Sequence, residues 1–175
     1  MKEIRTLKAN EIECRIGTIN KDGKGLTLLL YKDARCDMNV LDETFGSLNW
    51  KREHSRDNAN CIVSIWDESK KEWVSKEDTG SESNTEAEKG LASDSFKRAC
   101  VNWGIGRELY SSPFIWIGSD KCNITQNPVN KKYACYDKFR VTNFHCDENR
   151  EIDGLVIINE KTQKIVFALM PKEKK

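Results

Sequence analysis

The chain has 175 residues, of which 38% are hydrophobic and 33% charged, and its formal net charge is +1. A chain of this length and apolar content can bury a real core, which excludes a disordered chain and is typical of one domain. Near-neutrality excludes a uniformly basic surface, so any nucleic-acid interface must come from local clustering of basic residues.

The first third of the sequence predicts a β hairpin followed by a short helix. Residues 11–19 alternate apolar and polar side chains, residues 20–25 have turn chemistry, and residues 26–31 form a continuous apolar run. Asp33 is placed to cap a helix that stops at Gly46.

The middle third predicts a strand, a second hairpin and a helix. The strand covers residues 50–54, and residues 60–67 and 71–78 form the hairpin. The helix covers residues 85–103 and ends at the glycines that come after Trp103. Thr85 has capping-box spacing with Glu88, and Ser83 is an equally suitable cap.

The last third predicts further strands. A short apolar segment covers residues 113–117, and three strand candidates lie beyond it at residues 139–144, 155–158 and 165–169. The simplest assignment is one α+β domain whose sheet packs against the long helix.

Seven cysteines, an odd number, occur without a short CxxC pair. With no membrane-length apolar run and no signal peptide, this favours reduced thiols in a cytoplasmic protein that does not enter a membrane. A zinc site is conceivable, but the spacings match no structural zinc pattern, and we expect no metal. The four residues considered for it are Cys122, Cys135, His145 and Cys146.

The predicted helix carries adjacent cations outside its apolar half. Lys97 and Arg98 there can meet a regularly spaced row of phosphates from a rigid backbone. The alternative is an ordinary solvated face on which Asp94 neutralises Arg98 at i, i+4. The apolar half comprises Leu91, Ala92, Phe96, Ala99, Cys100 and Trp103.

Two further groups of residues suit nucleic acid. Arg107 comes after the helix, among aromatic residues that can stack on unpaired bases. Lys32 and Arg35, at the first helix, form a second cluster, which two aspartates dilute. The aromatic residues are Trp103, Tyr110, Phe114 and Trp116.

The sequence gives less support to a nucleotide-binding loop and to a nuclease centre than to a nucleic-acid interface. The glycine-rich residues 17–25 lack the spacing and the hydroxyl residue of a nucleotide-binding loop, and they join two strands, so we expect no nucleotide cofactor. Asp67, Glu72 and Lys76 can be drawn as the centre of a metal-dependent nuclease. The alternative for these three is the polar face of a hairpin with cross-strand pairs.

Three segments together resemble the Rad52 family of single-strand annealing proteins, most closely its bacteriophage members. They are residues 33–50 (DARCDMNVLDETFGSLNW), the strand pair ending at residues 77–80, and residues 93–104 (SDSFKRACVNWG). The resemblance covers roughly Ile12 to Tyr110, and the region after Pro113 is similar in overall character to extra strands of the phage proteins. It implies a single annealing domain over residues 1–175, with a core at 1–112 and a C-terminal β extension at 113–175.

The resemblance implies a curved antiparallel sheet against a long helix, with C-terminal strands added, and side-by-side assembly into rings. It implies that Lys97 and Arg98 contact DNA in an inner groove. Arg35 matches an arginine before the Phe-Gly…Trp element, although it lies one residue further from Phe45 than in the family pattern. Lys70 and Lys71 correspond to the basic hairpin tip of an outer DNA site. The long C-terminal partner-binding region of eukaryotic members is missing, so recruitment of a recombinase is not implied.

We therefore expect ATP-independent binding and annealing of single-stranded DNA in recombination and repair, with no cofactor and no covalent catalytic site. A ring repeats a few contacts many times, which lets a nearly neutral subunit form a strong groove. Expected partners are single-stranded DNA, further copies in a ring or spiral, and a single-strand-binding protein or exonuclease in the host cytoplasm. The alternatives are the metal-dependent nuclease and a non-catalytic structural or interaction module. The expected DNA contacts are Lys97, Arg98, Arg35, Lys32, Arg107, Lys70 and Lys71.

Overall fold

The computed structural model of the chain describes residues 3–81 and 87–171. The chain divides into two compact units, which we call unit 1 (residues up to Thr6 and Lys32–Arg107) and unit 2 (Leu7–Tyr31 and Glu108 onwards). None of the helices in the described ranges has the length and apolar content needed to span a membrane.

Unit 1 begins with helix α1 (Ala34–Phe45), which has the bounds that its caps predict. The Asp33 carboxylate accepts a hydrogen bond from the Cys36 N–H at 2.8 Å, so it satisfies one of the free amides of the first turn. Gly46, at φ +87°, ends the helix in a backbone conformation that favours glycine. The predicted helix is confirmed.

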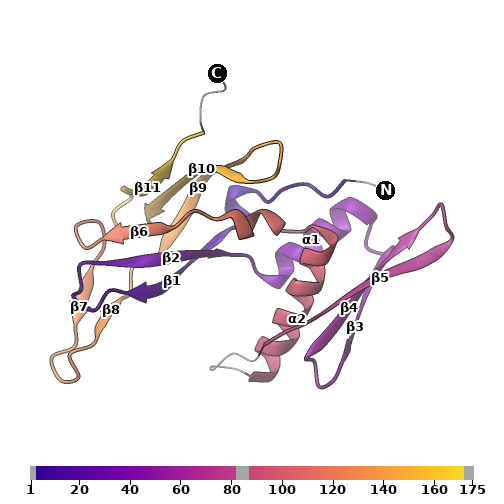
Figure 1. Ribbon diagram of the computed structural model, residues 1–175, viewed down its shortest axis with the longest axis horizontal. Helices are drawn as coiled ribbons and strands as arrows, with labels where there is room; N and C mark the ends of the chain where they lie inside the picture. Colours follow the sequence, from indigo (N-terminus) through magenta and orange to yellow (C-terminus); the bar gives the residue numbers. More distant parts are fainter. Residues whose placement is uncertain (1–2, 82–86, 172–175) are drawn as a thin grey trace. The chain divides into compact units, whose positions relative to one another are not determined.

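The sheet of unit 1 is a three-stranded antiparallel meander of β3 (Trp50–Ser55), β4 (Asn60–Asp67) and β5 (Glu72–Thr79). The β4–β5 ladder pairs Trp66 with Trp73, so the residues between Asp67 and Glu72 form the connecting turn. Both the predicted strand and the predicted hairpin are confirmed. Figure 1 shows the long β4–β5 arm.

Helix α2 (Ala87–Trp103) packs against β4 and β5. The rings of Trp50 and Phe96 stack with centroids 6.2 Å apart, and the indole N–H of Trp103 donates to the Val63 carbonyl at 3.0 Å. Apolar side chains facing this sheet are buried, which is what holds the helix in place. The predicted caps Ser83 and Thr85 lie outside the described residues.

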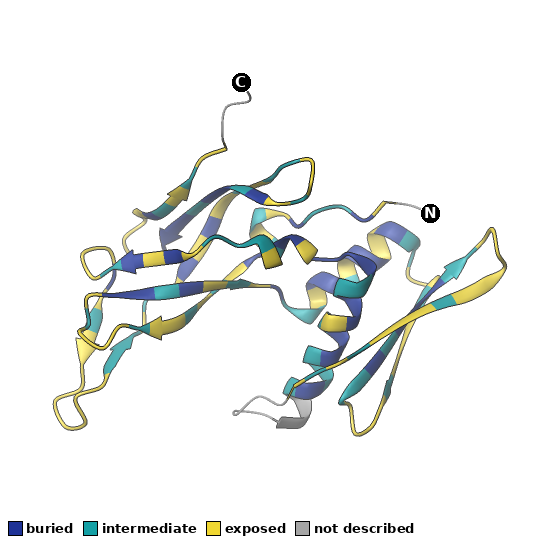
Figure 2. Cartoon of the chain, viewed as in Figure 1, coloured by how far each residue is buried: buried dark blue, intermediate teal, exposed yellow. Residues whose placement is uncertain are grey.

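Unit 2 is built on a six-stranded antiparallel sheet, in the order β11-β10-β9-β1-β2-β6. The Lys121 ammonium, after β6, donates to the Val166 carbonyl of β11 at 3.3 Å, so the curved sheet brings its two edges together. Figure 2 shows buried and exposed residues alternating along β6, as expected for a strand with one face on a core. The strands are β1 (Glu13–Ile19), β2 (Gly25–Tyr31), β6 (Ile115–Gly118), β9 (Phe139–Cys146), β10 (Ile152–Asn159) and β11 (Ile165–Leu169).

A buried carboxylate joins three segments of unit 2. Glu108, in the short helix η2 (Arg107–Ser111), is 2% exposed. Its Oε1 accepts from the Leu7 N–H at 2.6 Å, and its Oε2 accepts from the Arg150 guanidinium at 3.2 Å. The segment before η1 (Ala9–Glu11) and the β9–β10 turn are thereby fixed to η2.

The fold agrees with the sequence prediction in part. The antiparallel curved sheet and the C-terminal strands are confirmed. Helix α2, at 17 residues, covers most of the predicted helix. It packs on a three-stranded sheet that is not part of the six-stranded one, so the expectation of a single sheet is wrong, and a long helix against the curved six-stranded sheet is not shown. Residue periodicity does not reveal which strands pair. A hairpin of β7 (Ile124–Gln126) and β8 (Tyr133–Cys135) was not predicted.

Candidate nucleic-acid interface

All seven cations that the sequence singles out belong to unit 1. They lie at three places: on α2 and just after it, at the start of α1, and in the β4–β5 turn. The structure places six of them at least partly at the surface and buries one.

Lys97 and Arg98 lie next to buried residues of α2 but are not buried themselves. Lys97 is half-buried, and the Arg98 side chain is 48% exposed. Arg98 Nε lies 3.4 Å from Asp78 Oδ1 on β5. Pairing of Arg98 with Asp94 within the helix is wrong, because the Asp94 carboxylate accepts from the Ser81 N–H at 2.9 Å instead.

Lys32 is only 5% exposed, and its ammonium lies 2.5 and 2.6 Å from the two oxygens of the fully buried Asp37. This burial and pairing argue against a direct contact between Lys32 and DNA, so we leave Lys32 out of the proposed site. Burial raises the pKa of Asp37 to about 6, whereas the Lys32 and Lys97 ammonium groups act to lower it. Asp37 is thus charged at neutral pH and compensates Lys32, and Lys97 lies within electrostatic reach of the pair.

Arg35 points into solvent at the start of α1, where its side chain is 83% exposed. Its Nε donates to Asp33 Oδ2 at 2.9 Å, so the acid that caps the helix also holds this cation. Partial burial acts to raise the pKa of Asp33, but the hydrogen bonds from Cys36 and Arg35 lower it overall. Arg35 is free to reach a phosphate at the cost of one exposed ion pair.

The β4–β5 turn holds Lys70 and Lys71, both exposed. The Lys71 ammonium is paired with the Glu68 carboxylate, which also accepts from the Trp66 indole N–H at 2.7 Å. Hydrogen bonds from Lys71 and Trp66 lower the pKa of Glu68, so this carboxylate stays ionised. The charge of Lys71 is thus balanced locally.

Arg107 comes after the Gly104–Gly106 exit of α2 and turns back on the helix. Its guanidinium donates to the Val101 carbonyl at 3.0 Å and to the Asn102 carbonyl at 3.1 Å. The Lys76 ammonium reaches the same Asn102 oxygen at 2.8 Å. Two cations therefore donate to the last carbonyls at the negative end of the helix, and the Val101 carbonyl also accepts from the Gly104 N–H at 2.9 Å. The helix itself has no basic residue in its last turn.

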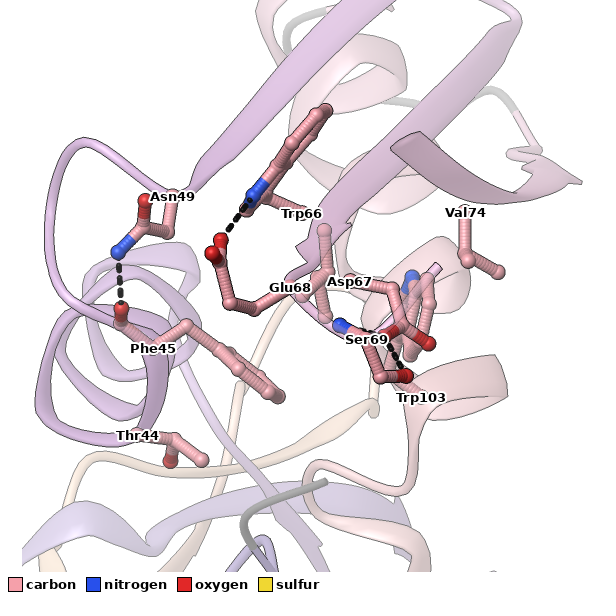
Figure 3. Close-up of a pocket in the computed structure, with 10 residues that line it drawn as sticks. Thr44, Phe45, Asn49, Trp66, Asp67, Glu68, Ser69, Val74 and Trp103 are labelled. Carbon is pink, nitrogen blue, oxygen red and sulfur yellow. Dashed lines mark hydrogen bonds between the residues drawn. The ribbon is translucent and has the colours of Figure 1, made fainter. Parts of the chain in front are cut away.

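Below the turn lies a pocket of about 440 Å³, shown in Figure 3. Phe45, Trp66 and Trp103 give it an apolar lining, and Asp67 and Glu68 line it as well. These carboxylates repel a phosphate, so we do not assign this pocket to DNA. Trp103 is a core residue here and not an exposed stacking platform.

The residues drawn for a nuclease do not converge. Asp67 and Glu72 face each other across the β4–β5 ladder, but Lys76 lies roughly 13 Å further along its strand, 4.6 Å from the Trp103 ring centroid. In the described part of the chain, no three His, Cys, Asp or Glu side chains form a group able to hold a metal ion. Of the four residues considered for zinc, Cys122 and Cys135 are hydrogen-bonded to each other, whereas His145 pairs with Asp153 at 2.5 Å.

Sequence reasoning missed Asp78 as the partner of Arg98. It noted that two aspartates dilute the charge at the first helix, but it did not assign Asp37 to Lys32. Asp78 is 20 residues from Arg98 in the chain and meets it only because α2 packs on β5. Asp37 had a visible signal: it shares an i, i+3, i+4, i+7 spacing with three residues on the buried face of α1. A charge on such a face requires a partner, and Lys32 supplies it.

A family model described as the Rad52/22 family double-strand break repair protein matches residues 4–127, more than half of the chain. No curated protein and no solved structure matches the chain. The matched residues include all of unit 1 from Ile4 onward and therefore all seven cations of the candidate interface.

Proposed function

The chain belongs to the Rad52/22 family of double-strand break repair proteins, and from this premise we propose that it binds single-stranded DNA and anneals complementary strands without ATP. Membership of the family gives the general role, which is DNA repair and recombination. The proposal concerns the finer step: which strand is bound, by which residues, and with what result.

The observation that carries the proposal is the Lys97–Arg98 pair on α2. Lys97 is partly accessible and Arg98 is exposed, on a helix whose other side is locked into the sheet. In the described part of the chain, the terminal nitrogens of Arg98 make no hydrogen bond, so they are available as a fork for phosphate oxygens. Such contacts hold the backbone and leave the bases free to pair.

Arg35 and Arg107 support the same assignment more weakly. Arg35 is exposed, and its ion pair with Asp33 is of the kind that contributes little to stability. Arg107 is exposed but has donated several hydrogen bonds to the end of α2. Lys70 and Lys71 complete the proposed set, and Lys32 is removed from it because it is buried.

We also propose that several copies act together in a ring or spiral. Each subunit offers six cations, and three of them are paired with acids, so a single copy attracts the DNA backbone only weakly. Repetition along one strand multiplies that attraction without any new contact within the subunit. Phage origin and a single-strand-binding or exonuclease partner belong to the same proposal.

The decisive experiment compares two double variants of equal charge change. Lys97→Ala with Arg98→Ala is measured against Lys161→Ala with Lys164→Ala, two exposed lysines of unit 2. Binding of a fluorescent single-stranded oligonucleotide is followed by anisotropy over a salt series. We expect the first variant to bind at least about tenfold more weakly and with a shallower salt dependence, because two phosphate contacts are lost. Equal binding by the two variants would show that the site is misassigned.

The rival functions are separated in the same assay. Two complementary labelled strands are mixed with the protein in EDTA without nucleotide, and then with Mg²⁺. Pairing in EDTA supports annealing, whereas cleavage that needs Mg²⁺ supports the nuclease. A monomer in light scattering with no affinity for the oligonucleotide fits only an interaction module.

A further inference from the structure

The surface cations of the proposed site share their charge with nearby acids. Arg35 is paired with Asp33 at 2.9 Å, and Lys71 is paired with Glu68. Each of these two acids also serves its own local structure, as a helix cap or in a turn. The pair that lies within the Lys97–Arg98 site is Arg98 with Asp78.

Asp78 is held by groups other than Arg98. Its Oδ1 accepts from the Thr79 N–H at 2.7 Å, and its Oδ2 accepts from the Asn102 amide at 3.2 Å. The Asn102 amide is in turn fixed on the Glu77 carbonyl at 2.9 Å. The carboxylate therefore keeps its position whether or not Arg98 stays beside it.

The contact to Arg98 is the loosest of the three. It is a single contact through Nε at 3.4 Å, and the arginine side chain is 48% exposed. A long, exposed, single-contact ion pair fixes a side chain weakly, so Asp78 does little to orient Arg98. The main effect of Asp78 on an incoming phosphate is electrostatic. Its fixed negative charge lies beside the Arg98 guanidinium, to which the phosphate would bind, and repels the phosphate.

We propose that Asp78 competes with the DNA phosphates for Arg98 and thereby weakens the binding of each subunit to the strand. This inference deepens the proposed function and rests on it. A strand that is held by many weakened arginine–phosphate contacts stays bound because the contacts are numerous. Each single contact nevertheless breaks easily when a complementary strand pairs with the bases. Changes in the strength of individual contacts within one interface alter the dissociation rate more than the association rate.

The test is Asp78→Asn, whose amide oxygen can still accept the hydrogen bond from the Thr79 N–H. The matched control is Glu53→Gln, which removes one charge from the same unit at an exposed residue paired with Lys51 on β3. Both variants and the parent are titrated with the oligonucleotide over a salt series, and duplex formation is timed at saturating protein. Thermal unfolding confirms that each variant is folded.

We expect Asp78→Asn to bind roughly three- to tenfold more tightly than Glu53→Gln at low salt, and to release the strand more slowly. Its logarithmic salt slope should steepen by about one contact per subunit, and annealing at saturation should slow. In an Arg98→Ala background the gain should vanish, because the competed cation is gone. Asp78→Glu, which retains the charge, should bind like the parent.

The inference is overturned if Asp78→Asn binds no better than Glu53→Gln, or if its gain persists without Arg98. Weaker binding by Asp78→Asn would show instead that Asp78 positions Arg98. These results presuppose a parent that binds the oligonucleotide. A parent that does not bind it contradicts the proposed function itself, so the two failures are distinguishable.

Discussion

The two units use their buried carboxylates differently. In unit 2, the carboxylate of Glu108 is enclosed and joins three chain segments. In unit 1, most ion pairs involve exposed side chains that can exchange partners, and the buried exception is Lys32 with Asp37. Unit 2 has exposed pairs as well, which join Lys24 to Asp22, Arg140 to Glu160 and His145 to Asp153. The informative difference is therefore between the two buried carboxylates: Glu108 holds chain segments of unit 2 together, whereas Asp37 compensates one lysine in unit 1.

The strongest test of this comparison is Glu108→Ala. The substitution leaves the Leu7 N–H without its acceptor and Arg150 without this carboxylate, which should lower the free energy of unfolding by about 3 kcal/mol. Urea unfolding at a fixed protein concentration measures it. Glu108→Gln, which retains an acceptor for Leu7, should lose about half as much. Unchanged stability would mean that the enclosed carboxylate does not maintain unit 2.

The second test is Lys32→Met, which leaves Asp37 buried without a counterion. We expect a loss of about 2 kcal/mol, because Asp37 can then take up a proton and limit the cost. The double variant with Asp37→Leu should recover much of that stability. Its oligonucleotide affinity should equal that of the parent. A stable double variant that has lost affinity would restore Lys32 as a DNA contact.

Arg107→Ala should have a smaller effect on both properties. The last carbonyls of α2 lose the Arg107 guanidinium but retain the Lys76 ammonium, so unfolding should become easier by about 1 kcal/mol. Oligonucleotide affinity should fall less than about threefold, since one phosphate contact is lost. Melting curves and anisotropy measure the two effects. A larger loss of affinity with unchanged melting would make Arg107 a principal contact.

Lys70→Ala with Lys71→Ala should change least. The Lys71 charge is already balanced by Glu68, so we expect at most about a twofold loss of affinity and no measurable change in stability. The same anisotropy titration measures it. A loss as large as that of the Lys97 and Arg98 double variant would move the main DNA contact from α2 to the turn.

The elements of unit 1 are largely readable from the sequence because each carries local chemistry. Asp33 and Gly46 bound α1, and the alternation around Val63 gives β4. The β7–β8 hairpin was missed because its strands are three residues long and lack an apolar alternation. Short strands are specified by their neighbours more than by their own residues.

The candidate site is readable only in part, for a related reason. Periodicity finds Lys97 and Arg98 outside the apolar half of α2, because that depends on residues within one helix. Whether a cation is exposed, buried or paired depends on contacts between elements distant in the chain. Lys32 and Arg98 therefore received the same interpretation from the sequence, although the structure buries one and leaves the other half-exposed.

Gly80, directly after β5, sets the spacing on which the Asp78–Arg98 pair depends. A methyl group on its Cα would lie 2.6 Å from the Ser95 nitrogen and 3.0 Å from the Leu91 oxygen, both backbone atoms of α2. Even an alanine at this position would clash with the α2 backbone, and β5 and α2 would have to move apart. The absence of a side chain at Gly80 thus lets the end of β5 approach the backbone of α2, and this close approach is what leaves Asp78 within reach of Arg98.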